Sequence, residues 1–183
     1  MKDKQSFVPT PEQCLALLNK YNTPKNVIEH CILVRRIAEE FCDKIPDLNR
    51  NLVVAGALLH DIGRSITHSI RHAVEGAKLL EKENVDQRVI NIVKKHIGTG
   101  ISLEESKKLG LPPDDYIPHT PEEIVVSYAD NLACGSEKCT FEVTLRHFIK
   151  KFGESSTVVS GFIKQRDFIE KLIKEAEKKK RAK

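Results

Sequence analysis

Ala57-Leu58-Leu59-His60-Asp61-Ile62-Gly63-Arg64 is the most informative stretch of this sequence. An apolar run typical of a buried helix ends in a histidine and an aspartate, and a glycine then breaks it. Burying an ionised carboxylate is costly unless a cation or strong hydrogen-bond donors meet it. An imidazole beside a carboxylate suits a divalent transition ion, and the carboxyl end of a helix favours one. A neutral core histidine bonded to a carboxylate would give the same pattern, so this stretch alone leaves a metal as one of two interpretations.

The rest of the sequence predicts helices and no strand. Thr10 and Thr120 are each followed by a proline and, three residues later, by a Gln or Glu, which is the pattern of a capping box at the start of a helix. Ser102 begins a capping box without the proline. Thr23-Pro24 has the same Thr-Pro start as the first two. We also expect caps at Asp47 and Asp86, and an arrangement of about seven to nine helices. The expected helices begin after Thr10, Thr23, Asp47, Asp86, Ser102 and Thr120, and cover His72–Glu83, Phe141–Phe152 and Thr157–Lys179.

Composition is typical of a soluble globular protein. The chain has 183 residues, 40% of them hydrophobic and 31% charged, which suits one domain. Residues 164–183 carry nine Lys and Arg against four Asp and Glu, so the net charge of +4 comes from a basic tail. We interpret this tail as a solvated helix end. With 5% aromatic residues and no tryptophan, stacking on nucleic acid is poorly supported.

Neither a signal peptide nor an 18-residue apolar run is visible, so we expect a cytoplasmic protein with no membrane partner. The five cysteines lack CxxC spacing, and we expect all of them to be reduced thiols that mostly fill the core. They are Cys14, Cys31, Cys42, Cys134 and Cys139.

Six polar residues occupy positions on or at the ends of five expected helices. All these helices have apolar faces, so packing could bring the six side chains into one pocket and explain them together. They are His30, His60, Asp61, His72, His96 and Asp130.

The order of these residues resembles the HD superfamily of metal-dependent phosphohydrolases, in its HDIG subgroup, over residues 26–132. The resemblance implies an all-α, single HD domain over residues 1–183, with a core at 24–134, C-terminal helices at 140–180 and a basic tail at 174–183. It implies that one metal is bound by His30, His60, Asp61 and Asp130. In two-metal members His72 and His96 hold a second ion and Asp61 bridges both, and this sequence retains both histidines.

Two narrower resemblances concern the substrate. Residues 71–77 with His96 are similar to HD-type hydrolases of dinucleoside polyphosphates, and still more to small archaeal HDIG proteins. A cyclic-phosphodiesterase role in pterin biosynthesis is associated with one archaeal relative of that kind. The sequence lacks a Gly-Tyr-Pro signature, which argues against the branch that hydrolyses cyclic-di-GMP.

The expected function is hydrolysis of a phosphoester in a small, nucleotide-like phosphorylated substrate by a monomer or homodimer. Bound metal would activate water and neutralise phosphate oxygens. Imidazoles with carboxylates suit Fe, Mn, Co, Ni or Zn better than Mg. Two alternatives are a catalytically inactive nucleotide-binding sensor and a helical nucleic-acid-binding protein that uses the basic tail.

The expected catalytic residues are Asp61, Arg64 and His96. For Arg64, binding of phosphate oxygens and a structural salt bridge are equally open. We expect His68 to face substrate or solvent, and Asn131 to orient Asp130 or a water. Lys94 and Lys95 are expected on a solvated face, with contact to substrate as the alternative. Tyr128, His119 and His147 are expected in packing or surface roles.

Overall fold

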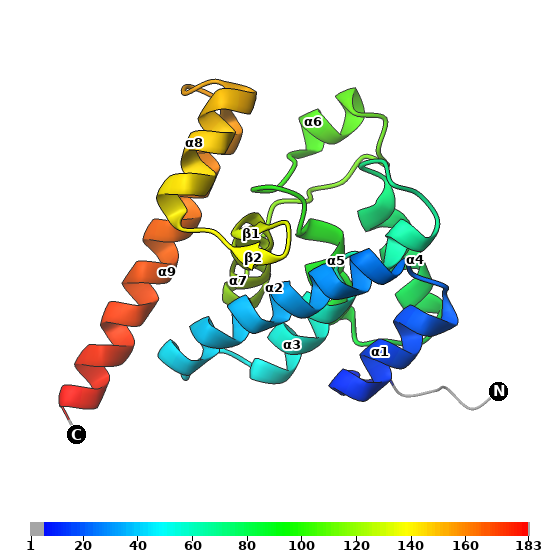
Figure 1. Cartoon of the computed structure of the whole chain (residues 1–183), viewed down its shortest axis with the longest axis horizontal. Coiled ribbons are helices and arrows are strands. Elements are labelled where there is room, and N and C mark those ends of the chain that lie inside the picture. Colours follow the sequence, from blue (N-terminus) through cyan, green and yellow to red (C-terminus); the bar gives the residue numbers. More distant parts are fainter. Residues whose placement is uncertain (1–5, 183) are drawn as a thin grey trace.

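Helices make up most of the computed structural model, which describes residues 6–182 (Figure 1). Residues 1–5 and 183 of the expected domain lie outside this range. The all-α prediction is confirmed, with nine α-helices in the described part, and a two-stranded antiparallel hairpin departs from it. The elements are α1 (Pro11–Lys20), α2 (Lys25–Lys44), α3 (Arg50–Leu59), the 3₁₀ turn η1 (Ile62–Ser65), α4 (His72–Lys82), α5 (Gln87–Lys95), α6 (Leu103–Lys108), α7 (Pro121–Asn131), β1 (Ala133–Cys134), β2 (Glu137–Lys138), α8 (Phe141–Phe152) and α9 (Thr157–Arg181).

Side-chain caps begin most of the helices. The capping boxes at Thr10, Ser102 and Thr120 are present, and the Asp86 carboxylate accepts from the backbone N–H of Arg88. Each cap satisfies a backbone donor that the first turn leaves without a partner. These predictions are therefore confirmed.

The structure corrects two predicted caps. Thr23 does not cap α2, because Pro24 occupies the cap position and the Thr23 side chain is buried. Asp47 does not cap α3, because Asn49 lies closer to the helix and its side chain accepts from the Leu52 backbone N–H.

The apolar helix α3 lies at the centre of the bundle. All its residues from Leu52 to Leu59 are buried, and it packs against α1, α2, α5 and α7. A Cβ atom added at Gly56 would lie 2.5 Å from Cγ2 of Ile92, so glycine permits the close approach of α5. The C-terminal end of α3 therefore lies in the interior, where His60 and Asp61 follow.

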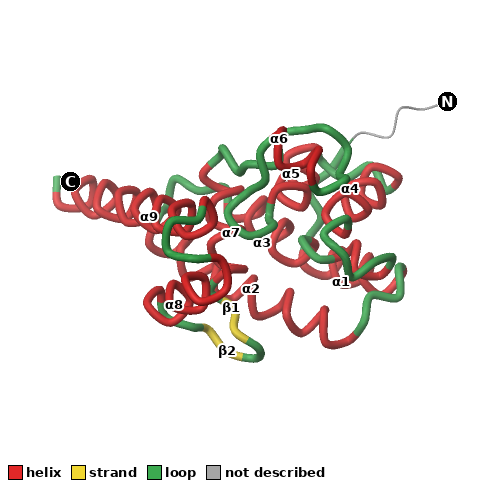
Figure 2. The backbone as a smooth tube through the Cα atoms, turned by 90° about the horizontal axis from the view of Figure 1, so that it is seen from above, coloured by secondary structure: helices red, strands yellow, loops and turns green. Residues whose placement is uncertain are grey.

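Helices α8 and α9 form an antiparallel pair beside this bundle (Figures 1 and 2). Phe162 of α9 is fully buried and contacts the rings of Phe141, Phe148 and Tyr128. In both views the C-terminal end of α9 extends past most of the other helices. Ile169 and Ala176 of α9 are also buried, and Lys179 pairs with Asp47. The pair is thus attached to the bundle along much of the length of α9.

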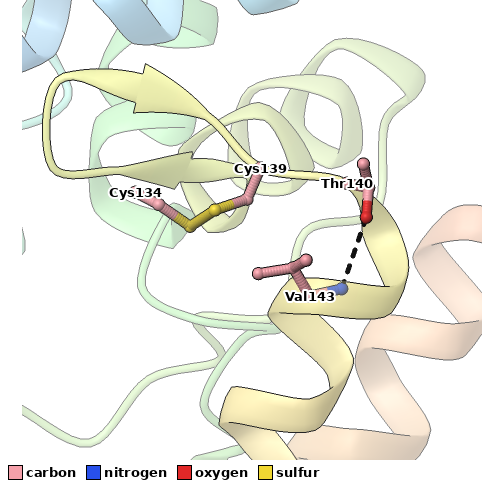
Figure 3. Close-up of a disulfide and its surroundings, with 4 residues drawn as sticks. All are labelled: Cys134, Cys139, Thr140 and Val143. Carbon is pink, nitrogen blue, oxygen red and sulfur yellow. Dashed lines mark hydrogen bonds between the residues drawn. A yellow bond between two sulfur atoms is a disulfide. The ribbon is translucent and has the colours of Figure 1, made fainter.

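The hairpin after α7 corrects the cysteine prediction. Cys134 and Cys139 form a disulfide across it, just before Thr140 caps α8 (Figure 3). The antiparallel register pairs Cys134 with Glu137, so the chain turns back and brings Cys139 close to Cys134. The three other cysteines are free and buried, as expected.

No helix within residues 6–182 combines the length and apolar character that crossing a bilayer requires.

Candidate metal centre

The structure brings all six candidate residues together from five helices. Each lies at or near the end of a helix that faces the interior, apart from His30, which lies in the second turn of α2. His60 follows α3, His72 begins α4, His96 ends α5 and Asp130 is the penultimate residue of α7. Four of the side chains are buried, while His30 and Asp130 are 26% and 20% exposed. The cluster therefore opens to solvent on the side of these two residues.

Asp61 lies between two sets of histidines. Its Oδ1 is 3.0 Å from Nε2 of His72 and 3.5 Å from Nε2 of His96. Its Oδ2 is 3.7 Å from Nε2 of His60 and 4.0 Å from Nε2 of His30. The two oxygens of one carboxylate thus face two different pairs of imidazoles.

Asp130 completes the set around Oδ2 of Asp61. Its Oδ1 lies 2.9 Å from Nε2 of His30 and 3.5 Å from Nε2 of His60. Oxygen and nitrogen atoms from His30, His60 and Asp130 lie within 4.8 Å of one another, and so do those from His60, Asp61 and His96. Both groups are compact enough to bind an ion through several atoms at once.

Backbone carbonyls fix the orientation of the three buried imidazoles. Nδ1 of His60, His72 and His96 lies 2.7–2.8 Å from the carbonyl oxygen three residues earlier in the chain. A carbonyl only accepts, so each Nδ1 carries the proton and donates it. In the neutral imidazole each Nε2 then has a free lone pair, and all three Nε2 atoms point into the cluster.

These lone pairs leave the cluster without enough donors. Nε2 of His72 is 3.0 Å from Nε2 of His96, and both are acceptors in the neutral tautomers that the carbonyls select. Nε2 of His60 and Oδ1 of Asp61 are buried without a hydrogen-bond partner among the described residues. Buried polar atoms normally have partners. A positive ion that binds several of these atoms would satisfy all of them, so the donor set fits a divalent transition metal.

The protonation equilibria favour the same charge pattern. Burial alone would raise the pKa of Asp61 and Asp130, but the charge of His60 and contacts with the other imidazoles lower both well below the usual range. Burial also lowers the pKa of His96, which keeps this imidazole neutral. Burial would lower the pKa of His60 as well, but its neighbours Cys31, Asp61 and Asp130 raise it well above its usual value. The two ionised carboxylates therefore attract positive charge, which a proton on His60 or a metal ion in its place can supply.

The residues around the cluster are placed as follows. Nε of Arg64 donates to Oδ2 of Asp61 at 2.6 Å, so the structure shows the salt bridge that was one of its two predicted roles. His68 is exposed. Asn131 donates to the carbonyl oxygen of Gly98 at 2.6 Å and to Gln165, so the prediction that it orients Asp130 is not supported by its hydrogen bonds.

The two lysines before His96 have carboxylate partners. Lys94 pairs with Asp114, and Lys95 pairs with the buried Glu123 at 3.2 Å. The expectation of a simple solvated face is thus wrong for Lys95, whose side chain is 16% exposed. Its partner Glu123 belongs to the capping box that Thr120 begins, so the ion pair joins the end of α5 to the start of α7.

The predicted packing and surface residues behave as expected. Tyr128 is buried beside Phe41 and Phe162. His119 pairs with Asp115 on the surface, and His147 is exposed.

Sequence reasoning missed the groups that hold the cluster in place. The carbonyls of Ala57, Ser69 and Val93 have no side-chain signature, since any residue supplies one. Gly63 was noted only as a helix breaker, yet a Cβ atom there would lie 1.9 Å from the carbonyl oxygen of His72. The only sign of this role in the sequence was the position of the glycine three residues after His60.

Residues 27–134 match the family model of the HD domain. The chain is 45% identical over 148 residues to a tRNA (cytidine(56)-2'-O)-methyltransferase of Thermoplasma volcanium. This match covers 81% of this chain and 44% of the methyltransferase. The chain thus spans less than half of that relative. It is 40% identical over 167 residues to an uncharacterized protein of Methanocaldococcus jannaschii, covering 89% of this chain and 98% of the relative.

The fold is similar to that of the HD domain of the phosphodiesterase PgpH from L. monocytogenes, in a crystal structure with cyclic-di-AMP. The TM-score is 0.60 at 19% identity, covering 88% of this chain and 92% of that one. The family match extends over more than half of the chain and contains all six clustered residues. This chain therefore belongs to the HD domain family.

Proposed function

We propose that this protein is a metal-dependent phosphohydrolase that cleaves a phosphoester of a small, nucleotide-like molecule. One observation carries the proposal. Three imidazoles, each fixed by a carbonyl at Nδ1, direct their Nε2 atoms towards a carboxylate whose Oδ1 has no hydrogen-bond partner within residues 6–182. A structural core has no need of such an arrangement, whereas a hydrolytic metal site does.

The geometry supports a division of the six residues into two ligand sets that share Asp61. His30, His60 and Asp130 lie on the Oδ2 side and would hold one ion. His72 and His96 lie on the Oδ1 side and would hold a second. Fe, Mn, Co, Ni or Zn would suit this mixture of nitrogen and oxygen atoms.

Ions bound there would lower the pKa of a coordinated water and neutralise phosphate oxygens. The protein's own groups would set the geometry. Arg64 holds Asp61 through Nε, and its side chain is 30% exposed, so the rest of the guanidinium is free to bind non-bridging phosphate oxygens. Asp61, Arg64 and His96 are the residues that we propose to act on the reacting phosphate.

Two relatives support the substrate class. PgpH is named a phosphodiesterase, and its HD domain was crystallised with cyclic-di-AMP, a cyclic phosphodiester of nucleotides. This favours a diester and a nucleotide-like ligand. The methyltransferase of T. volcanium is named for tRNA, but the match covers 44% of it, so we give RNA the second place among substrates.

The test combines metal analysis with two chromogenic substrates. Protein prepared without chelator or nickel resin should contain a transition metal and hydrolyse bis-p-nitrophenyl phosphate with Mn²⁺ or Fe²⁺, faster than p-nitrophenyl phosphate if a diester is preferred. His60→Ala and Asp61→Ala should lose metal and activity while far-UV helicity is retained. His96→Ala should keep one ion and lose the second, and His147→Ala serves as a control at an exposed histidine.

The outcomes separate this proposal from its alternatives. Unchanged metal content in all three variants would refute the ligand assignment. Nucleotide binding without turnover by fully metallated protein would favour the sensor. Loss of RNA or DNA binding upon deletion of residues 174–183, in a protein that hydrolyses neither substrate, would favour a nucleic-acid-binding protein.

A further inference from the structure

A second feature near the cluster is a pocket of about 580 Å³ between α6, α8, the start of α9 and the turn after α5. Its volume is in the range of small-molecule sites, which are mostly apolar with a few polar groups. Seven of the fifteen residues that line it are aliphatic or aromatic, among them Phe148, Phe152 and Val158, and two are the lysines Lys108 and Lys151.

The pocket begins next to the six clustered residues. Ile97 and Gly98 line it and directly follow His96, while Asn131 lines it and directly follows Asp130. Asn131 is held there by its hydrogen bond to the Gly98 carbonyl. A molecule whose phosphate lies at the cluster could therefore place an attached group in this pocket.

Aromatic side chains form the wall opposite these residues. The rings of Phe148 and Phe152 meet edge to face with their centroids 5.8 Å apart, and Phe148 rests on the buried ring of Phe162. Phe152 is 43% exposed, and Nζ of Lys151 lies 5.0 Å from the centroid of its ring. Flat, partly exposed rings of this kind stack with planar ligands.

The charge at the rim is positive. Lys108 and Lys151 line the pocket, and neither forms an ion pair within residues 6–182. The acid that also lines it, Glu105, already accepts from the backbone and the hydroxyl of Ser102 at 2.9 and 2.7 Å. Lys108 helps to lower the pKa of Glu105, so the pocket is lined by two positive charges against one negative charge, and this net charge of +1 favours an anionic ligand.

We propose that this pocket binds the planar aromatic base of a phosphate ester, with Phe152 as a stacking surface and Lys151 as a contact to an anionic group. The inference rests on the proposed function, which places the phosphate at the cluster. Phe148, Lys151, Phe152 and Val158 lie outside the family match at residues 27–134. The α8–α9 pair would thus determine which phosphoesters this protein selects within its family.

Equilibrium binding tests the pocket without requiring turnover. Metal-loaded protein is titrated calorimetrically with the non-hydrolysable 5′-phosphonate analogues of adenosine 5′-monophosphate and of ribose 5-phosphate, which differ only in the base. We expect the nucleotide to bind at least about tenfold more tightly, since stacking of one base on an aromatic ring has that magnitude. Phe152→Ala should remove most of this preference. Lys151→Ala should weaken both ligands, whereas Lys150→Ala, an exposed neighbour that does not line the pocket, should weaken neither.

Several results would overturn the inference. One such result is that both ligands bind equally or not detectably. Another is that Phe152→Ala leaves the preference for the nucleotide unchanged. A third is that Phe152→Ala dissociates a dimer, which would make this surface an interface between copies of the chain. Failure of the proposed function looks different. A protein that prefers the nucleotide through Phe152 but contains no metal and hydrolyses no ester would retain the pocket and lose only the hydrolase.

Discussion

Replacing Gly63 by alanine should destabilise the protein strongly, because this glycine sets the distance between η1 and α4. A Cβ atom at residue 63 would lie 1.9 Å from the carbonyl oxygen of His72 and 2.5 Å from the backbone nitrogen of Gly76. Both obstacles are main-chain atoms in the first two turns of α4, so no side-chain rotation can relieve the overlap. Either α4 moves away as a unit or η1 distorts.

The size of the effect follows from the kind of atoms that clash. Overpacking a core typically costs about 1–3 kcal/mol when side chains can adjust. Because backbone must move here, we expect about 3 kcal/mol or more. For a chain of this length each kcal/mol shifts Tm by roughly 2–4 °C, so Tm should fall by roughly 6–12 °C. His72 moves with α4, so the second ion should also be lost.

Thermal and urea unfolding followed by circular dichroism would measure this loss. Gly161→Ala is a comparison with a milder clash, because its Cβ atom would lie 2.5 Å from Oγ1 and 2.7 Å from Cβ of Thr99, which are side-chain atoms on a loop and not main-chain atoms of a helix. Alanine is also favoured over glycine within a helix such as α9, which offsets part of the cost. This variant should therefore lose less stability than Gly63→Ala. If Gly63→Ala unfolds at the same temperature as the parent, the close approach of η1 and α4 described above is wrong.

Three further predictions concern protonation, thiols and the tail. With metal removed, the free energy of unfolding should fall as pH drops from about 5 to 3. The pKa of Asp130 is lower in the folded state than its unfolded value of about 3.9. The ionised carboxylate therefore stabilises the fold above the unfolded pKa, and this stabilisation is lost as pH falls below it. Urea titrations should show a shallower fall for Asp130→Asn, and equal slopes would contradict the reasoning. Burial raises the pKa of Cys14 to about 12, so iodoacetamide at pH 8 should leave it unmodified in native protein and alkylate it in urea, as mass spectrometry of peptides would show. Deleting residues 174–183 should change hydrolysis of bis-p-nitrophenyl phosphate less than twofold, because Lys179 pairs with Asp47 after the C-terminal end of α2, whereas His30 lies near the other end of that helix. A larger loss would place the tail near the site.

Local rules predicted the helix starts well where one residue alone could supply the cap. Thr10, Ser102 and Thr120 each lie three residues before a Gln or Glu whose side chain accepts from the cap's backbone N–H, and all three were assigned correctly. The prediction failed where two neighbours compete. Asp47 and Asn49 are both good caps, and the choice between them depends on where Leu48 and Leu52 enter the core, which is a tertiary property.

The six clustered residues could be proposed from the sequence because their types and order are distinctive. Their supports could not, since the Val93 carbonyl has no signature in a sequence. The Cys134–Cys139 disulfide was missed because it depends on a hairpin too short to show a strand pattern. The pocket beside Phe152 was missed because it exists only when α8 and α9 dock against the bundle.

The separation of the clustered residues along the chain has a consequence for how the protein acquires its ions during synthesis. His72 and His96 are 24 residues apart, whereas His30 and Asp130 are 100 residues apart. Closing the longer loop costs more conformational entropy and has to await the last helix of the core. A nascent chain can thus assemble the Oδ1 side of Asp61 first, and occupancy of the other side then reports that folding of the bundle is complete.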